Sequence, residues 1–163
     1  MEYIHVVHTF EPIFDAESKI LILGSFPSVK SRENQFYYGH PQNRFWKVTA
    51  EIFGEQIPVT IQEKKAFLLR NHLALWDVIA SCDIIGSSDS SIRNVVANDM
   101  DVILNAANIR QICANGTTAY QLFLKYCKKD TMPEICKLPS TSPANAAWSV
   151  PRLTEVWKAV LGS

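Results

Sequence analysis

The chain has 163 residues, of which 47% are hydrophobic and 20% are charged. This size and composition predict a single domain over residues 1–163 with a sizeable core. Sixteen basic residues balance sixteen acidic ones, which excludes a protein that attracts nucleic acid through its overall charge. The apolar runs are too short to span a bilayer, and no cationic stretch precedes an apolar run at the N-terminus. We therefore expect a cytoplasmic protein with no membrane association.

The four cysteines, at positions 82, 113, 127 and 136, include no C-x-x-C pair. Their spacing predicts neither a zinc site nor an iron–sulfur cluster. Cys113 and Cys127 lie in apolar segments and are expected to be buried thiols. The sequence thus predicts no metal and no cofactor.

A strand and a long loop follow one another near the N-terminus. Residues 20–23 form a short apolar run that ends at Gly24 and predicts a buried parallel strand. Residues 25–41 have no clear period, which predicts a loop, and so long a loop in a compact domain is usually functional. The charged residues of this region are interpreted as a solvated cluster: Lys30, Arg32, Glu33, Arg44 and Lys47.

Helices and strands then alternate along the chain. Helices are predicted from apolar periodicity and capping residues over residues 45–52, 60–69, 101–104, 118–128 and 149–161. Strands are predicted from short apolar runs over residues 73–78, 109–114 and 134–138. This alternation predicts an α/β fold, a three-layer αβα sandwich with a central, mainly parallel four-stranded sheet.

The carboxyl ends of the predicted strands mark one candidate site. Ligands of open α/β sheets bind beyond these ends. The four segments found there are polar or rich in Gly and Pro: residues 24–28, 76–77, 115–116 and 139–145. We expect them to meet in a single pocket.

Two motifs resemble those of a known family. Gly24-Ser25-Phe26-Pro27-Ser28, together with the run from Phe36 to Val48 that contains His40-Pro41-Gln42-Asn43-Arg44-Phe45-Trp46, resembles the first half of mismatch-specific uracil and thymine DNA glycosylases. Leu138 to Asn145 resembles their second motif. Within the uracil-DNA glycosylase superfamily, the chain is most similar to the hypoxanthine-DNA glycosylase (DNA-deoxyinosine glycosylase) branch.

The resemblance implies a base-excision repair enzyme that works without a cofactor. Such a monofunctional glycosylase flips a deaminated base out of DNA, with hypoxanthine favoured, and hydrolyses its N-glycosidic bond to leave an abasic site. We expect the protein to act as a monomer on DNA. Two alternatives remain open: a mismatch-type uracil or thymine glycosylase, and a catalytically silent module that binds DNA damage.

The catalytic residues depart from the pattern of the relatives. An asparagine that positions water in the first motif is replaced by Phe26, and the polar residue that opens the second motif by Leu138. We expect Asn43 to take over the orientation of water, with Asp77 as a weaker catalytic candidate. The structural alternative is that Asn43 caps the following helix and that Asp77 caps a turn or helix.

The remaining site residues are assigned to base and phosphate. Tyr38 matches the aromatic residue that stacks on the flipped base in the relatives. Asn115 is a candidate for reading a base edge, with an Asn-Gly turn as its alternative. The other base-binding candidates are Gly24, Ser25 and Phe26. The candidates for contacts to the DNA backbone are Ser28, Pro139, Ser140 and Ser142.

Overall fold

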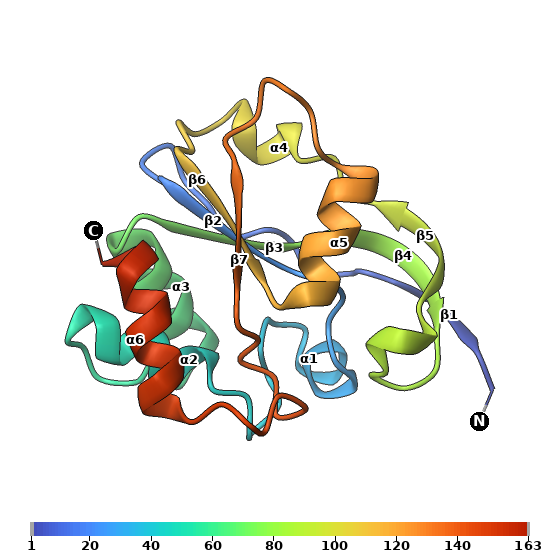
Figure 1. Cartoon of the computed structure of the whole chain (residues 1–163), viewed down its shortest axis with the longest axis horizontal. Helices are drawn as coiled ribbons and strands as arrows, with labels where there is room; N and C mark the ends of the chain where they lie inside the picture. The colour runs from blue at the N-terminus through green and yellow to red at the C-terminus, as the bar shows by residue number, and fades with distance from the viewer. Residues whose placement is uncertain (1, 163) are drawn as a thin grey trace.

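The computed structural model describes residues 2–162, and a four-stranded sheet runs through its centre (Figure 1). The strand order is β3-β2-β6-β7, and every neighbouring pair is parallel. The strands are β2 (Ile20–Gly24), β3 (Leu73–Asp77), β6 (Gln111–Asn115) and β7 (Ile135–Leu138). The predicted α/β fold with a central parallel sheet is confirmed.

Helices cover both sides of this sheet, as Figure 1 shows. On one side lie α2 (Phe45–Phe53), α3 (Ile61–Arg70) and α6 (Val150–Leu161), and α5 (Thr117–Tyr126) lies on the other. The short helix α4 (Asp101–Leu104) connects β5 to β6. Phe45 of α2 and Trp157 of α6 are fully buried and pack edge to face, with ring centroids 5.9 Å apart. Burying two large aromatic side chains provides a major part of the stability at this helix pair.

Local signals set the helix ends. Gly54 ends α2 with a left-handed φ of 63°, which glycine adopts without steric cost. Thr60 and Glu63 form the predicted capping box of α3. The hydroxyl of Ser149 accepts a hydrogen bond from the Arg152 backbone N–H at the start of α6. These boundaries agree with the predictions because capping depends on neighbours within one turn.

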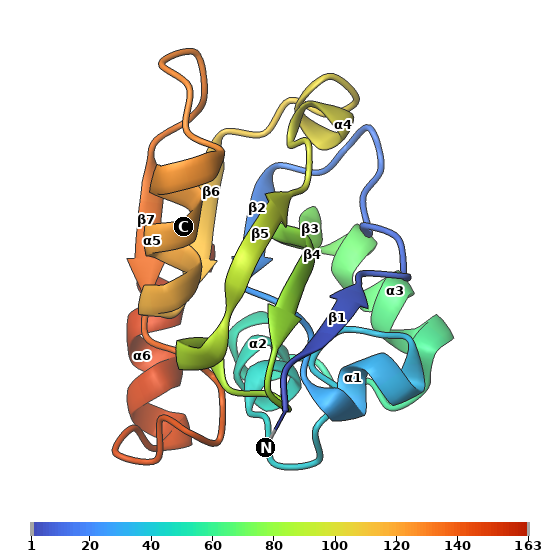
Figure 2. The same ribbon diagram turned by 90° about the vertical axis from the view of Figure 1, so that its right-hand side faces the viewer.

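A second sheet and a short helix were not predicted. The antiparallel sheet β1-β4-β5 consists of β1 (Ile4–Val7), β4 (Ile79–Ile84) and β5 (Arg93–Ala97), and Figure 2 shows it beside the main sheet. Its outer strands β1 and β5 are largely exposed, so their sequences lack a strong apolar pattern. Helix α1 (Val29–Asn34) lies inside the segment predicted as a loop, because Ser28 supplies its N-cap.

In residues 2–162, the structure contains no helix with the length and apolar character needed to cross a membrane.

Candidate functional site

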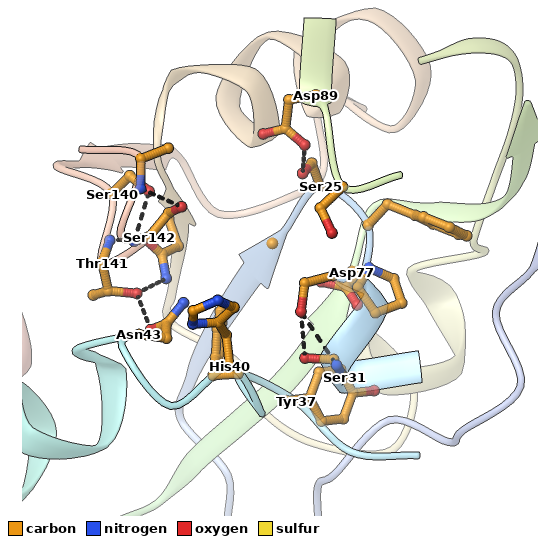
Figure 3. A pocket seen from close by; sticks show the side chains of 18 of the residues that line it. Ser25, Ser31, Tyr37, His40, Asn43, Asp77, Asp89, Ser140, Thr141 and Ser142 are labelled. Carbon is orange, nitrogen blue, oxygen red and sulfur yellow. Dashed lines mark hydrogen bonds between the residues drawn. The ribbon is translucent and has the colours of Figure 1, made fainter. Parts of the chain in front are cut away.

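A pocket of about 340 Å³ opens at the carboxyl ends of the parallel strands (Figure 3). All four segments expected to meet there contribute to its lining. Most of the predicted site residues line it: Gly24, Ser25, Phe26, Ser28, Tyr38, Asn43, Asp77, Asn115, Ser140 and Ser142. Pro139 lines an adjacent hollow instead. Parallel strands produce this convergence because their carboxyl ends share one edge of the sheet.

Asn43 lies one residue before Arg44, the N-cap of α2, and also faces the pocket. Its Oδ1 accepts a hydrogen bond from the backbone N–H of Phe45 at 2.9 Å. The same oxygen accepts a second hydrogen bond from the Thr141 hydroxyl, also at 2.9 Å. The amide nitrogen of Asn43 has no hydrogen-bond partner among the described residues. The same side chain therefore contacts the first residue of α2 and lines the pocket.

Asn115 binds the second motif. Its Nδ2 donates to Oγ1 of Thr141, and the Thr141 backbone N–H donates to its Oδ1, each at 3.0 Å. Thr141 is fully buried. The following Gly116 has a φ of 98°, and a Cβ there would lie 3.1 Å from Cβ of Ser140. The hydrogen bonds of Asn115 and the close packing of Gly116 against Ser140 thus hold the second-motif loop against the end of β6.

Arg44 is directed into the protein rather than toward solvent. Its guanidinium donates to the carbonyl oxygens of Thr141 at 3.3 Å, Ser142 at 2.7 Å and Asn145 at 3.0 Å, and also to that of Trp148. A planar guanidinium suits several carbonyls at once. Arg44 thereby fixes the loop that carries the second motif.

Other members of the predicted solvated cluster also have partners. The guanidinium of Arg32 donates to the carbonyl oxygen of Gly86 at 2.7 Å, and Lys30 pairs with Glu33 at 3.3 Å on the surface. Arg32 and Arg44 thus depart from the interpretation of these residues as a solvated cluster, whereas Lys30 and Glu33 lie on the surface.

Asp77 lies at the end of β3 with its carboxylate almost fully buried. Its Oδ2 contacts Nε2 of His8 at 2.8 Å, and the two side chains are 5% and 3% exposed. Asp77 lines the pocket, and its Oδ1, which lies beside Gly24, has no hydrogen-bond partner in residues 2–162. A Cβ on Gly24 would lie 2.4 Å from this oxygen, so the close approach of Asp77 to β2 requires glycine.

Tyr38 forms an aromatic wall of the pocket. Its ring stacks on Phe45 with centroids 4.2 Å apart and an interplanar angle of 18°. Its backbone has a left-handed φ of 52°, a strained conformation that often occurs at functional sites. The hydroxyl is buried and has no hydrogen-bond partner in the described part of the chain. Burial and the Asp77 carboxylate raise the pKa of Tyr38. The Asn115 amide lies near the hydroxyl and opposes this rise, although the two groups do not form a hydrogen bond.

Phe26 and Ser25 line the pocket beneath the second sheet. Phe26 packs with Ile79 and Cys82 in a small apolar cluster, which makes it a wall residue. Ser25 donates to Oδ1 of Asp89 at 3.0 Å (Figure 3). Although Asp89 is exposed as a residue, its carboxyl group points toward Ser25, and desolvation there raises its pKa.

The candidate backbone-binding serines are partly engaged within the protein. Ser28 accepts from the backbone N–H of Ser31 and donates to its hydroxyl, both at 3.2 Å. Ser140 and Ser142 each accept a backbone N–H two residues further along, which leaves their own O–H groups to donate. Their contacts to DNA phosphates stay a prediction.

Several residues of the site gave no sequence signal. His8 reaches Asp77 from 69 positions away, and Asp89 lies on the short 3-10 helix η1 (Asp89–Ser91). Only the tertiary fold brings His8 to Asp77 and Asp89 to the pocket. Thr141, in contrast, lies inside the second motif and within the strand-end segment 139–145, and this place was its available signal. Among residues 2–162, no cluster of three or more histidine, cysteine or carboxylate side chains is arranged to hold a metal ion.

Comparison with known proteins places this fold and pocket in one family. The profile of the uracil DNA glycosylase superfamily matches residues 11–161. A protein from Methanosarcina acetivorans named hypoxanthine DNA glycosylase is 37% identical over 155 residues, covering 93% of this chain and 95% of the relative. A protein of the same name from Methanosarcina barkeri is 35% identical over 109 residues, covering 66% of this chain and 69% of the relative.

A solved structure agrees with the sequence relatives. The solution NMR structure of a candidate uracil DNA glycosylase from Methanosarcina acetivorans has a TM-score of 0.78 and 36% sequence identity to this chain. The match covers 93% of this chain and 94% of the solved one. The motifs, the sheet and the pocket at its carboxyl edge thus have one common explanation: the chain belongs to the uracil DNA glycosylase superfamily.

Proposed function

We propose that this chain is a monofunctional DNA glycosylase of base-excision repair that removes a deaminated base, with hypoxanthine preferred. One observation carries the proposal: Asn43 and Asp77 share a pocket with the ring of Tyr38, and the Asn43 amide nitrogen and Asp77 Oδ1 have no hydrogen-bond partner within residues 2–162. Hydrolysis of a glycosidic bond in a flipped nucleotide needs polar groups for water and base, and an aromatic surface for the base.

The reaction requires charge to be stabilised at two places. The C1′–N bond breaks with its electron pair passing to the base, water adds to C1′, and one proton of the water ends on the base. The sugar becomes positively charged in the transition state, so a carboxylate such as Asp77 nearby stabilises it electrostatically. We assign the free Oδ1 of Asp77 as the acceptor for the attacking water and Asn43 as the second polar catalytic group.

The ring of Tyr38 is assigned to stacking on the flipped base. Phe45 supports one face of this ring, which leaves the pocket side for a ligand. Stacking tolerates different bases, so it does not by itself select hypoxanthine. The preference is supported by the names of the two Methanosarcina relatives and by Phe26 and Leu138 at positions where uracil and thymine enzymes carry polar residues.

Cleavage of defined duplexes tests the proposal. Duplexes that contain one deoxyinosine, deoxyuridine or deoxyxanthosine are incubated with the protein and then treated with alkali, which breaks the strand at an abasic site. Breaks mainly at deoxyinosine support the proposal. Breaks at deoxyuridine alone favour the mismatch-type alternative, and binding without breaks favours the damage-binding module.

DNA is the expected partner, with the protein acting as a monomer. The hydroxyls of Ser140 and Ser142, beside the pocket, are assigned to phosphates that flank the flipped nucleotide. Because phosphate contacts release counterions, binding should weaken as salt increases. Affinity that is unchanged between low and moderate salt would contradict this assignment.

A further inference from the structure

We infer that Thr141 is a positioning residue that sets the polarity of Asn43, so that Asn43 presents only N–H donors to the pocket. The inference rests on the proposed function, and it assigns Asn43 to the departing base rather than to accepting a proton from water. Figure 3 shows Thr141 and Asn43 side by side, joined by a hydrogen bond.

The orientation of Asn115 follows from one backbone group. A backbone N–H can only donate, and that of Thr141 lies 3.0 Å from Oδ1 of Asn115. The atom of Asn115 at this position must therefore be its oxygen. Its amide nitrogen then faces Oγ1 of Thr141 at 3.0 Å and donates to it.

The direction of the next hydrogen bond is determined in turn. The Thr141 hydroxyl has a single hydrogen and already accepts from Asn115, so its hydrogen is directed to Oδ1 of Asn43 at 2.9 Å. Thr141 is fully buried, which excludes competition from bulk water. The hydroxyl thus connects Asn115 to Asn43 in one direction only.

A second backbone group determines the orientation of Asn43 independently. The N–H of Phe45 donates to Oδ1 of Asn43 at 2.9 Å. This oxygen receives two donors, which use both of its lone pairs. Its –NH2 group has no partner among the described residues, and Asn43 lines the pocket. The side chain therefore offers donors, and no acceptor, to whatever enters.

This polarity selects between two chemical roles. A donor directed at the attacking water would withdraw electron density from the nucleophile, whereas a donor directed at the base stabilises the anion that departs. Removing one such donor in a dry site typically lowers the rate by about 10²- to 10³-fold. The acceptor for water is then a carboxylate, which we have assigned to Asp77. This assignment of Asn43 to the departing base replaces the expectation that Asn43 orients the attacking water.

Substitutions at Asn43 and Thr141 test the inference under single-turnover conditions on a deoxyinosine duplex. Asn43→Asp retains an oxygen for Phe45 and Thr141 but has no N–H. We expect it to be slower by about 10²-fold or more across the pH range, because it loses the donor and adds charge beside the base anion. An Asn43→Asp variant that matched or exceeded the wild-type rate, particularly at higher pH, would show an acceptor role and overturn the inference.

Thr141 variants test positioning. Thr141→Val, which lacks the hydroxyl, should lower the rate by about 10- to 100-fold, and Thr141→Ser should restore most of it. Binding to a duplex with 2′-fluoro-deoxyinosine, which resists cleavage, should stay close to wild type for both variants, and urea unfolding checks that they fold. Thr154→Val is the matched control, because the Thr154 hydroxyl bonds, among the residues that the structure describes, only to Val150 O within α6.

The outcomes separate the inference from the function. If the wild-type chain cleaves deoxyinosine and Thr141→Val cleaves it equally fast, the inference fails and the function stands. An equal loss in Thr141→Ser and Thr141→Val would also overturn it, because the hydroxyl would then not be the operative group. If the wild type cleaves none of the duplexes, the function fails, and the inference fails with it.

Discussion

Replacing Arg44 by alanine should destabilise the protein by removing the group that holds the second-motif loop. The guanidinium donates to four carbonyl oxygens between residues 141 and 148. A hydrogen bond from a charged donor contributes about 1.5–3 kcal/mol. Because Arg44 is only partly buried and water replaces some of these bonds, we expect a total loss of about 3 kcal/mol rather than the sum.

Lysine at this position gives a graded result. Arg44→Lys keeps the charge but lacks the planar fork that reaches several carbonyls. We expect it to lose about 1–2 kcal/mol of unfolding free energy. Both variants should also cleave DNA more slowly, because the loop carries Thr141 and the serines beside the pocket. Urea unfolding followed by tryptophan fluorescence measures the stability, and single-turnover cleavage measures the rate.

The exposed neighbour Lys47 provides the control. If the free energy of unfolding of Arg44→Ala lay within about 0.5 kcal/mol of the wild-type value, as is typical of a surface substitution, the proposed role of Arg44 in holding the loop would be refuted. A weaker and less salt-dependent binding to DNA without any loss of stability would instead identify Arg44 as a phosphate ligand. Lys47→Ala should leave the stability unchanged.

Three further predictions concern the pocket and the core. Tyr38→Phe removes a buried hydroxyl that has no partner among the described residues. This variant should keep its cleavage activity and gain up to about 1 kcal/mol of unfolding free energy. Tyr38→Ala should lose base binding, and equal activity of the two variants would contradict the stacking role. His8→Ala frees the carboxylate of Asp77 and should slow single-turnover cleavage by about 10-fold. The exposed His5, which lies on β1 three residues before His8, should be replaceable without effect, and equal rates for the two alanine variants would refute the role of His8. Burial raises the pKa of Cys113 to about 12, whereas the thiol in the unfolded chain has a pKa of about 8.5. Between these two pH values the folded protein keeps the Cys113 proton and the unfolded chain loses it. The contribution of Cys113 to the free energy of unfolding should therefore be fully present below about pH 8.5 and decrease as the pH rises toward about 12. Urea unfolding at two pH values should show that the free energy of unfolding of Cys113→Ala depends less on pH than that of the wild type.

Much of the architecture follows from local sequence. The run from Ile20 to Leu23 is continuously apolar, and its residues are buried on both faces of the sheet, as parallel strands require. Gly54, Thr60 and Ser149 end or begin helices through bonds within one turn. Because these interactions involve neighbours in the chain, a single sequence is enough to predict them.

The candidate pocket was predictable in position more than in detail. The rule that ligands bind beyond the carboxyl ends of parallel strands located Asp77 and Asn115 in one place, and the family resemblance added Asn43. It did not predict their hydrogen bonds. Asn115 was expected to read a base, and the structure shows that it binds Thr141 with both ends of its amide.

The second sheet marks the limit of prediction from sequence. Strand β4 continues from β3 and pairs with β1 and β5, and β1 brings the N-terminal segment with His8 to the buried side of Asp77. The β1–β4 pairing joins distant residues, from Ile4 with Ile84 to Val7 with Ser81. The exposed strands have no apolar alternation from which they could be predicted.

The sequence by itself determined the family, the parallel sheet and the segments that form the pocket, because motifs, periodicity and caps are short-range properties. Only the tertiary structure decided which polar atoms are already engaged and which remain for a ligand. The direction of the Asn43 amide, the partner of Asp77 and the inward direction of Arg44 depend on contacts between distant segments, and burial removes the water that would otherwise satisfy these groups.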